Sequence, residues 1–246
     1  MPSIKIGPNF CLEYAPNTFF MIKKWLSYIV PINIKTEKSA LSKTLEVTWA
    51  NGELVLDSAQ TNYSYGSLQR ILRRGLQNIG FERIAKMNHI LVLGVAGGSV
   101  IKTLSNEVGY KNIITGVEID AQVIQIARKY FDLDSILNLN LVVDDAFEFV
   151  LKTKDKYDLI IIDIFQDTKM PNFLFETFFI NRILEILKPQ GIFLFNTMCL
   201  NELDNKRNAV YLKVLYEQAV NVRTIPRIES HNELIIVEKL GNDAAS

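Results

Sequence analysis

A run of small residues directly after an apolar segment is the feature that most constrains this chain. Residues 89–100 read HILVLGVAGGSV, in which HILVL predicts a buried strand and the next five residues hold three glycines and an alanine. Glycine lets a chain turn sharply and lets a ligand approach the backbone, because no Cβ atom stands in the way. A helix predicted to begin near Gly98 directs its free N–H groups toward the same point. The segment therefore predicts a strand, a ligand-binding turn and a helix.

Strand and helix patterns alternate from residue 90 onward, which predicts parallel strands joined by crossover helices. The apolar runs LIIID and IFLFN are typical of strands that are covered on both faces. The predicted fold class is therefore α/β. The predicted strands are residues 90–93, 113–118, 140–143, 159–163, 192–197, 223–228 and 233–239, and the helices are predicted to begin near Gly98, Ala121, Ala146 and Phe173.

The segment before the glycine loop follows a different pattern. Residues 44–57 alternate apolar and polar side chains around Asn51 and Gly52, a dipeptide that tolerates the positive φ angles of a tight turn. A β-hairpin is predicted here, followed by a helix over residues 65–79. We expect an N-terminal region over residues 1–66, a nucleoside-binding catalytic domain over 67–240 and a loose tail over 241–246.

The first thirty residues contain an apolar and aromatic stretch. Two lysines, Lys23 and Lys24, interrupt it, so it is not expected to span a bilayer. On a helix, Ile22, Leu26 and Ile29 share one side with Phe19 at a spacing of three to four residues. This predicts an amphipathic helix that packs on the domain or on a second subunit, and a homodimer formed through this segment is one expectation.

Composition excludes several classes of function. Lys and Arg number 27, as do Asp and Glu, so no basic field is expected to hold a nucleic acid. The two cysteines and two histidines lack metal-ligand spacing, so no metal site is expected. So few cysteines suit a reducing cytoplasm, which is the expected location.

Acidic residues follow the next two predicted strands. Glu118 ends the second strand, 20 residues beyond Gly98, where a carboxylate can accept hydrogen bonds from both hydroxyls of a ribose. Asp145 ends the third strand, where it can accept from an adenine amino group, and Asp144 competes for that role. One of the two aspartates is expected to cap the following helix. Together with the loop, these acids predict a nucleoside site.

The loop itself limits the choice of nucleoside. The dinucleotide fingerprint needs glycine where Ala96 and Ser99 stand, and the loop lacks the lysine of a phosphate-binding loop. An uncharged loop beside acidic residues suits a positively charged nucleoside such as a sulfonium. The residues predicted to bind it are Gly94, Ala96, Gly97, Gly98, Glu118, Ile119, Asp144, Asp145 and Ala146.

At these residues the sequence resembles the spermidine synthase family and its relatives in the class I S-adenosylmethionine-dependent methyltransferase fold. The resemblance spans about residues 44–197 and includes SAQTNYSYG, LGVAGGSV, VEIDAQVIQIARKYF, DDAFEFVLKTKDKYDLIIID and LKPQGIFLFN. It implies a Rossmann-like, mostly parallel seven-stranded sheet preceded by a small β-hairpin region. It also implies S-adenosylmethionine, or its decarboxylated form, as the donor substrate.

The resemblance also assigns residues on the acceptor side. The family's active-site strand ends in a motif resembling D-S-S-D-P, whose first aspartate takes a proton from the attacking amine. Here the strand ends in DIFQD, so Asp163 keeps that role, Gln166 stands at the second aspartate, and Asp167 lies one residue later. Phe165 is expected to line the acceptor pocket.

Other positions depart from the family pattern. A family aspartate that holds the aminopropyl amine in the loop is replaced by Gly97, and of a Tyr-His-Glu segment only Tyr65 is kept. Gln60 stands where a family glutamine contacts the nucleoside side chain. Loss of two acids and a histidine should weaken diamine binding, by about 1–3 kcal/mol per lost charged hydrogen bond. A glycine at position 97 suits the carboxylate of S-adenosylmethionine.

Three hypotheses follow for the function. The favoured one is methyl transfer from S-adenosylmethionine to a small, unidentified acceptor. The second is aminopropyl transfer from the decarboxylated donor to putrescine, which would make the acceptor a polyamine. The third is a nucleoside-binding module without catalysis. All three predict the same nucleoside site and differ in the chemistry at Asp163.

Overall fold

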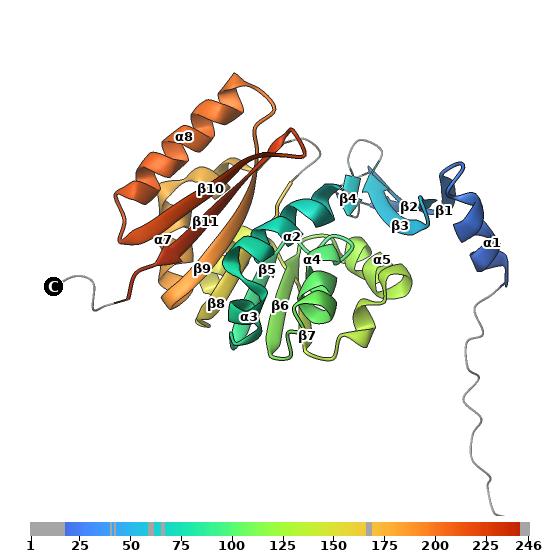
Figure 1. The fold of residues 1–246 in the computed structure, drawn as a ribbon, viewed down its shortest axis with the longest axis horizontal. Coiled ribbons are helices and arrows are strands. Elements are labelled where there is room, and N and C mark those ends of the chain that lie inside the picture. Colours follow the sequence, from blue (N-terminus) through green and yellow to red (C-terminus); the bar gives the residue numbers. More distant parts are fainter. Residues whose placement is uncertain are drawn as a thin grey trace, which may run out of the picture.

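The described part of the chain contains two sheets of different construction (Figure 1). The computed structural model describes residues 18–39, 41, 43–58, 62–64, 67–165 and 169–241, and every structural statement concerns these residues. The predicted site residues Gln60, Tyr65, Gln166 and Asp167 lie outside them, as does the tail from residue 242.

The larger sheet has seven strands in the order β10-β11-β9-β8-β5-β6-β7. Strands β5 to β9 pair in parallel, whereas β11 is antiparallel to both of its neighbours. This arrangement confirms the predicted α/β fold with a mostly parallel seven-stranded sheet. The strands are β5 (His89–Leu93), β6 (Ile113–Glu118), β7 (Leu139–Val143), β8 (Tyr157–Ile162), β9 (Leu187–Met198), β10 (Val220–Ile228) and β11 (Asn232–Lys239).

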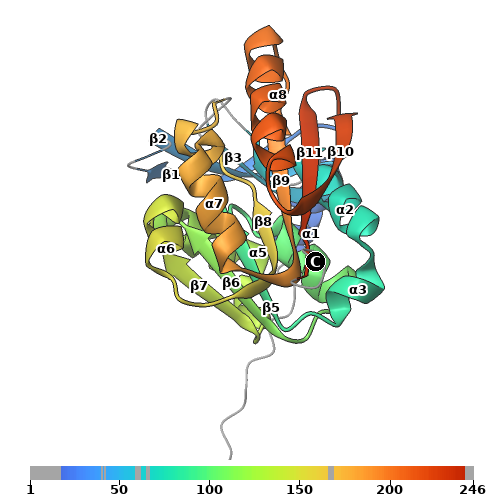
Figure 2. The ribbon, with the colours of Figure 1, turned by 90° about the vertical axis from the view of Figure 1, so that its left-hand side faces the viewer.

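Helices cover both faces of this sheet (Figure 2). Buried side chains of α2 to α5 form one apolar cluster with the strands, and those of α6, α7 and α8 form a second cluster on the other face. The burial of the strands on both sides explains their nearly continuous apolar sequences. The helices are α2 (Ser67–Ile79), α3 (Phe81–Ala85), α4 (Ser99–Lys102), α5 (Ala121–Phe131), α6 (Ala146–Lys152), α7 (Thr177–Ile186) and α8 (Glu202–Tyr216).

Two helices differ from the prediction in detail. The helix after the glycine loop has only four α-helical residues and continues as a π-helix over Thr103–Glu107. The helix predicted near Phe173 begins at Thr177, because residues 172–175 form a separate 3-10 turn and Glu176 is extended. Short 3-10 helices also occur at Leu133–Ser135, so the connecting segments use tighter turns than the sequence pattern suggests.

The smaller sheet is antiparallel, with the strand order β1-β2-β3-β4. Its central pair confirms the predicted hairpin, because Asn51 and Gly52 adopt φ angles of 50° and 78° in the turn. The two outer strands were not predicted. The apolar face of this sheet packs against Val123, Ile126 and Phe131 of α5. The strands are β1 (Ile32–Ser39), β2 (Lys43–Ala50), β3 (Glu53–Ser58) and β4 (Asn62–Ser64).

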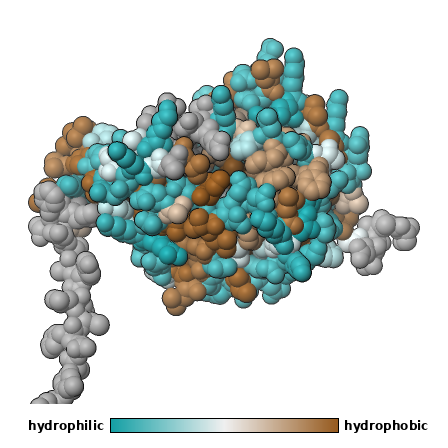
Figure 3. Space-filling model, turned by 180° about the vertical axis from the view of Figure 1, so that it is seen from behind, coloured by the Kyte–Doolittle hydropathy of each residue, from teal (hydrophilic) through white to brown (hydrophobic). Residues whose placement is uncertain are grey.

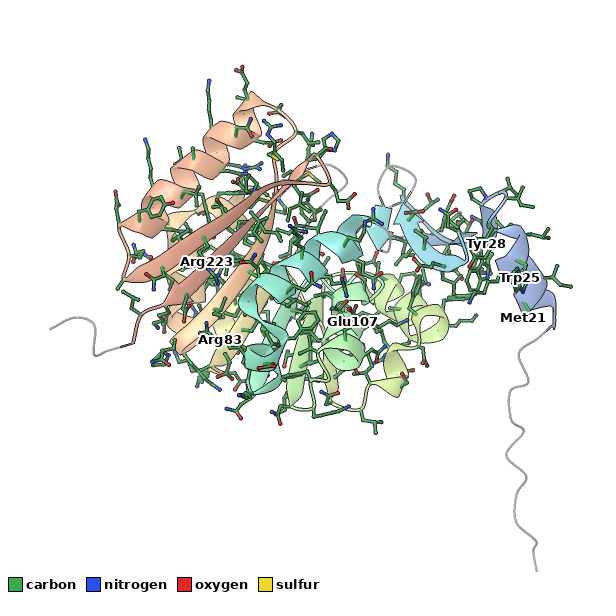
Figure 4. All side chains as sticks on the ribbon, viewed as in Figure 1. Met21, Trp25, Tyr28, Arg83, Glu107 and Arg223 are labelled. Carbon is green, nitrogen blue, oxygen red and sulfur yellow. The ribbon has the colours of Figure 1, made fainter. Side chains whose placement is uncertain are left out.

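From Met21 onward, the apolar side chains of the N-terminal helix α1 (Thr18–Leu26) lie in solvent. Ile22, Leu26 and Ile29 are 52%, 49% and 86% exposed, and Figure 4 shows Met21 and Trp25 at the end of the molecule farthest from the large sheet. Ile22, Leu26 and Ile29 therefore do not pack on the domain as predicted. In the described part of the chain, α1 contacts the small sheet through Lys24, which lies over the ring of Trp49, and the turn after α1 bonds to the hairpin. Packing on a second subunit stays a prediction. None of the described helices is both long and apolar enough to cross a bilayer.

Candidate functional site

The loop of residues 94–98 joins β5 to α4 at the carboxyl edge of the parallel strands. Gly94 has a φ of 88°, and its N–H donates to the carbonyl oxygen of Val117 at 2.9 Å. A Cβ atom on Gly94 would collide with the carbonyl oxygen of Asp163. Glycine is therefore required at this position for the ends of β5 and β8 to lie side by side, apart from any ligand.

The rest of the loop is also tightly constrained. Gly98 adopts a φ of 78°, and a Cβ atom there would collide with the side chain of Leu133. Ala96 has a φ of 48°, a left-handed conformation that costs an alanine about 1 kcal/mol. Gly97 is buried. The backbone is held in this strained shape by a side chain from the neighbouring strand.

That side chain is Glu118 at the end of β6. Its Oε2 atom accepts hydrogen bonds from the N–H groups of Val95 at 3.1 Å and Ala96 at 3.0 Å, and Oε1 accepts from Asp120 at 3.1 Å. The residue is only 8% exposed, and this burial raises the pKa of its carboxyl, while the three N–H donors act in the opposite direction. A carboxylate has about four acceptor positions, so one remains for a ribose hydroxyl.

The two aspartates after β7 have separate roles. Asp145 caps α6, since its Oδ1 accepts from the N–H groups of Phe147 at 2.7 Å and Glu148 at 3.3 Å. Asp144 accepts from the N–H of Asp145 at 2.9 Å. The Oδ2 atom of Asp145 has no hydrogen-bond partner among the described residues and can accept from an adenine amino group. The capping aspartate is therefore also the one predicted to bind the base.

Apolar surface lies beside these acids. Ile119 directly follows Glu118 and is 44% exposed, and Val143 directly precedes the two aspartates and is 54% exposed. Since β6 and β7 pair in parallel and in register here, both side chains belong to one edge of the sheet. The exposed side chain of Ile119, at the same sheet edge as the two aspartates after β7, fits the flat face of a purine. Ala146, also predicted here, is the first residue of α6.

Asp163 follows β8, on the other side of β5 from Glu118. Its N–H donates to the carbonyl oxygen of Leu93 at 2.9 Å, which fixes the backbone at the end of the strand. Burial raises the pKa of its carboxyl to about 6, and the charge of Glu118 acts in the same direction. The Nδ2 atom of Asn196 donates to Oδ1 at 2.9 Å and partly offsets this effect.

Asn196 is itself oriented by a second asparagine. Its Oδ1 accepts from Nδ2 of Asn232 at 3.0 Å, so the amide must present its N–H side to Asp163. The two asparagines are 0% and 7% exposed. The sequence analysis missed both. An asparagine inside the apolar run IFLFN was an available signal for Asn196, whereas Asn232 is brought there only by the antiparallel pairing of β11 with β9.

The described acceptor side consists of Asp163 and the residues after it. Phe165 is half-buried and packs against the apolar cluster of α7 and α8. The roles of Gln60, Tyr65, Gln166 and Asp167 stay predictions, since these residues lie outside the described ranges. Within those ranges no three or more His, Cys, Asp or Glu side chains gather as metal ligands would.

A comparison with known protein families identifies the family of this chain. A family model described as the spermine/spermidine synthase domain matches residues 70–229, which include the glycine loop, both acidic strand ends and Asp163. The chain belongs to the spermine/spermidine synthase family. This membership confirms the resemblance found in the sequence.

Members and relatives of two kinds match this chain. An eEF1A lysine and N-terminal methyltransferase homolog of Drosophila melanogaster is 25% identical over 68% of this chain and 26% of its own length. A polyamine aminopropyltransferase of Vibrio vulnificus is 30% identical over 61% of this chain and 50% of its own length. The chain thus spans half or less of the length of these relatives.

A solved structure supports the fold. Human methyltransferase-like protein 13 in complex with SAH has a TM-score of 0.59 to this chain, with 22% identity over 73% of this chain and 84% of that one. At this identity the likeness concerns the fold alone. It confirms that the spermidine synthase-like chain has the architecture of class I methyltransferases.

Proposed function

We propose that this family member is a transferase that binds an S-adenosylmethionine-type donor at the glycine loop and transfers a methyl group to a small acceptor. The observation that carries the proposal is the half-buried carboxyl of Asp163, which Asn196 holds by a hydrogen bond and which lies across β5 from Glu118 at the carboxyl edge of the sheet. Ligands of open parallel sheets bind outside this edge. An oriented acid beside a nucleoside site supports group transfer.

Three features support the donor. Glu118 retains one acceptor position for a ribose hydroxyl, and Oδ2 of Asp145 is available for an amino group. Ile119 offers an apolar surface for the base. The loop carries no basic side chain, so it favours a nucleoside without a pyrophosphate. The residues present therefore fit an adenosyl sulfonium compound.

The buried glycine at position 97 supports methyl transfer over aminopropyl transfer. The decarboxylated donor carries an ammonium group at its chain end, and a buried ammonium needs a carboxylate or several oriented acceptors. The described loop has no acid at positions 94–98. S-adenosylmethionine carries a carboxylate beside its ammonium, so an acid at position 97 would repel it and a glycine would not.

In this proposal the enzyme aligns two reactants and removes a proton. The donor's sulfonium makes its adjacent carbon reactive, so alignment accounts for much of the rate. Asp163 accepts the proton of the attacking nucleophile, and the amide of Asn196 holds its Oδ1 by a hydrogen bond, which leaves Oδ2 for the proton. A pKa of about 6 keeps this carboxyl ionised at neutral pH while leaving it basic enough to take a proton.

Aminopropyl transfer is the second candidate. The similarity to a polyamine aminopropyltransferase, at 30% identity, favours it independently of the site. Under this alternative the amine of a polyamine attacks the aminopropyl carbon, and Asp163 takes the amine proton. Asp144 and Asp167 would have to replace the acids that the loop and the DIFQD segment lack.

Calorimetry with both donors tests the proposal. We expect S-adenosylmethionine to bind, and binding of the decarboxylated donor alone would contradict methyl transfer. Incubation with putrescine and the decarboxylated donor, followed by detection of methylthioadenosine, tests the second candidate directly. Binding of neither donor would contradict both and favour a module without this chemistry.

A further inference from the structure

We propose that the groove between α2 and β10 is a second binding site, selective for a small ligand that carries two adjacent phosphoryl groups. The groove has a volume of about 460 Å³, within the range of small-molecule sites. Four arginines, one acid and four uncharged residues line it, namely Arg70, Arg73, Arg74, Arg227, Glu229, Gln77, Ile225, Pro226 and Ile228. The proposal is independent of the proposed transferase function.

Arginine is concentrated here although the whole chain is electrically neutral. Of the nine arginines in the sequence, five lie on α2 and β10, including Arg223. Figure 4 shows Arg223 and Glu107 on one face of the molecule, whereas apolar side chains gather on the opposite face (Figure 3). The guanidinium group forms paired hydrogen bonds with phosphate, so a groove lined by arginine rather than lysine favours a phosphorylated ligand.

Two of the arginines are held in place by acids. Arg70 forms a fork with Glu229, with Nε to Oε1 at 2.8 Å and Nη2 to Oε2 at 3.1 Å. Arg73 pairs with Glu107 of the π-helix. These contacts fix two guanidinium groups on one wall before any ligand binds, which lowers the entropy lost on binding.

The other two arginines have no acidic partner among the described residues. Arg74 projects from α2 and Arg227 from β10, so they line the groove from its two walls. Both residues are exposed, and neither forms an ion pair in this part of the chain. Two uncompensated cations on facing walls match the charge of two linked phosphoryl groups.

The backbone of β10 is distorted in a way that serves this arrangement. The pairing register with β11 shifts between Ile225 and Ile228, and Arg227 in the bulge has a φ of 51°. Glu229 and Ser230 in the following turn also have positive φ angles, of 49° and 72°. A bulge redirects a side chain out of the ladder, and left-handed non-glycine residues are costly.

The helix α2 likewise departs from what stability alone favours. Arg70 repels Arg73 and Arg74 at spacings of three and four residues, and the first turn of the helix has no acid. The arginines could instead keep this helix face solvated, or protect the edge strand β10 from pairing with another strand. Lysines would serve either purpose equally well, and neither purpose requires the bulge. Like-charge repulsion and strained backbone that do not stabilise the fold are typical of binding sites.

Titration calorimetry of the full chain with sodium pyrophosphate at low salt tests the proposal. We expect saturable binding that the double substitution Arg74→Gln, Arg227→Gln weakens by about tenfold or more, since two charge-assisted hydrogen-bond donors are lost. Arg128→Gln on α5 is the control, because Arg128 is exposed and lies in the described part of the chain outside the groove, where it pairs with Asp134. The control should bind pyrophosphate like the unsubstituted chain.

Two additional arms identify the source of the phosphoryl groups. If a nucleoside diphosphate competes with pyrophosphate and binds more tightly than it, the apolar residues Ile225 and Ile228 contact the base. If the nucleoside diphosphate and pyrophosphate bind with equal affinity, the site is one for free pyrophosphate. No saturation up to about 10 mM pyrophosphate, or binding unchanged in the double variant, would overturn the proposal. Binding of a single-stranded oligonucleotide that pyrophosphate does not displace would overturn it in favour of an extended nucleic acid.

Discussion

Glu118 ends β6 and Asp163 directly follows β8, on the two sides of β5, but the hydrogen-bond partners of the two carboxyl groups differ in kind. Glu118 is held by three backbone N–H groups, two of which lie in the glycine loop. Asp163 is held by the side-chain amide of Asn196, which is in turn held by Asn232. The carboxylate of Glu118 is therefore fixed by the main chain, whereas that of Asp163 is fixed by asparagine side chains that a substitution can remove.

Because of this difference, substitutions at the two carboxylates should have different consequences. Changes at Glu118 should disturb the loop and the donor site together, because the carboxylate is part of the loop's own hydrogen bonding. Changes behind Asp163 should leave the donor site intact, because β9 and β11 pair through their backbones whatever side chains they carry.

Asp163→Asn should have the largest effect. Loss of the proton acceptor should lower turnover roughly 10²- to 10⁴-fold, while donor affinity stays within about threefold. Turnover is measured as release of the spent donor, and affinity by calorimetry. Retention of most activity in a folded variant would remove Asp163 from the chemistry and would break the comparison on the acceptor side.

Glu118→Gln should affect stability and donor binding together. The amide replaces an oxygen that accepts backbone N–H bonds, so the free energy of unfolding should fall by about 1–3 kcal/mol. We expect donor affinity to fall by about tenfold or more in the same variant. Chemical denaturation and calorimetry measure the two effects, with the exposed Glu148→Gln as control. A loss of affinity without loss of stability would show that Glu118 does not hold the loop.

Asn196→Ala should lower turnover by about tenfold and leave donor affinity unchanged. The amide hydrogen bond lowers the pKa of Asp163, so its removal should move the acidic limb of the pH–rate profile to higher pH. Asn112→Ala is a matched control, because Nδ2 of Asn112 donates to the carbonyl oxygen of Met87 at 2.8 Å at the opposite edge of the sheet. An unchanged pH profile together with lost stability would make Asn196 merely structural.

The pH dependence of stability should show the smallest effect. The pKa of Asp163 is raised from 3.8 to about 6, so between these values the native state binds more protons than the unfolded chain. Stability should therefore fall as pH rises from about 4 to 6, whereas turnover should rise through the same range. Asp57, whose pKa is also raised to about 6, has the same sign. The difference between unfolding curves of the unsubstituted chain and Asp163→Asn isolates the contribution of Asp163.

The positions of the loop and acids of the proposed donor site could be predicted from the sequence because each lies next to a strand end. The glycine loop follows β5, Glu118 ends β6 and Asp145 is the second residue after β7, and parallel strands bring their carboxyl ends to one edge. The predicted range 113–118 and the start at Ala121 coincide with β6 and α5. The hairpin was predictable for the same reason, since Asn51 and Gly52 fix its turn locally.

The acceptor half and the arginine groove could not be predicted in this way. Asn196 is 33 residues from Asp163, and Asn232 is 36 residues from Asn196. Arg70 and Glu229 are 159 residues apart. Sequence periodicity gives the face of a strand or helix on which a residue lies, but it does not give the strand order or the register that bring distant faces together.

Local sequence patterns were enough to predict the α/β class, the glycine loop and the acids at the carboxyl ends of β6, β7 and β8, because apolar periodicity and turn residues act over a few positions. Only the tertiary structure decided that Glu118 supports the loop, that two asparagines orient Asp163, and that the apolar side of α1 faces solvent. The physical reason is that hydrogen bonding and burial at these residues depend on the packing and register of strands and helices far apart in the chain.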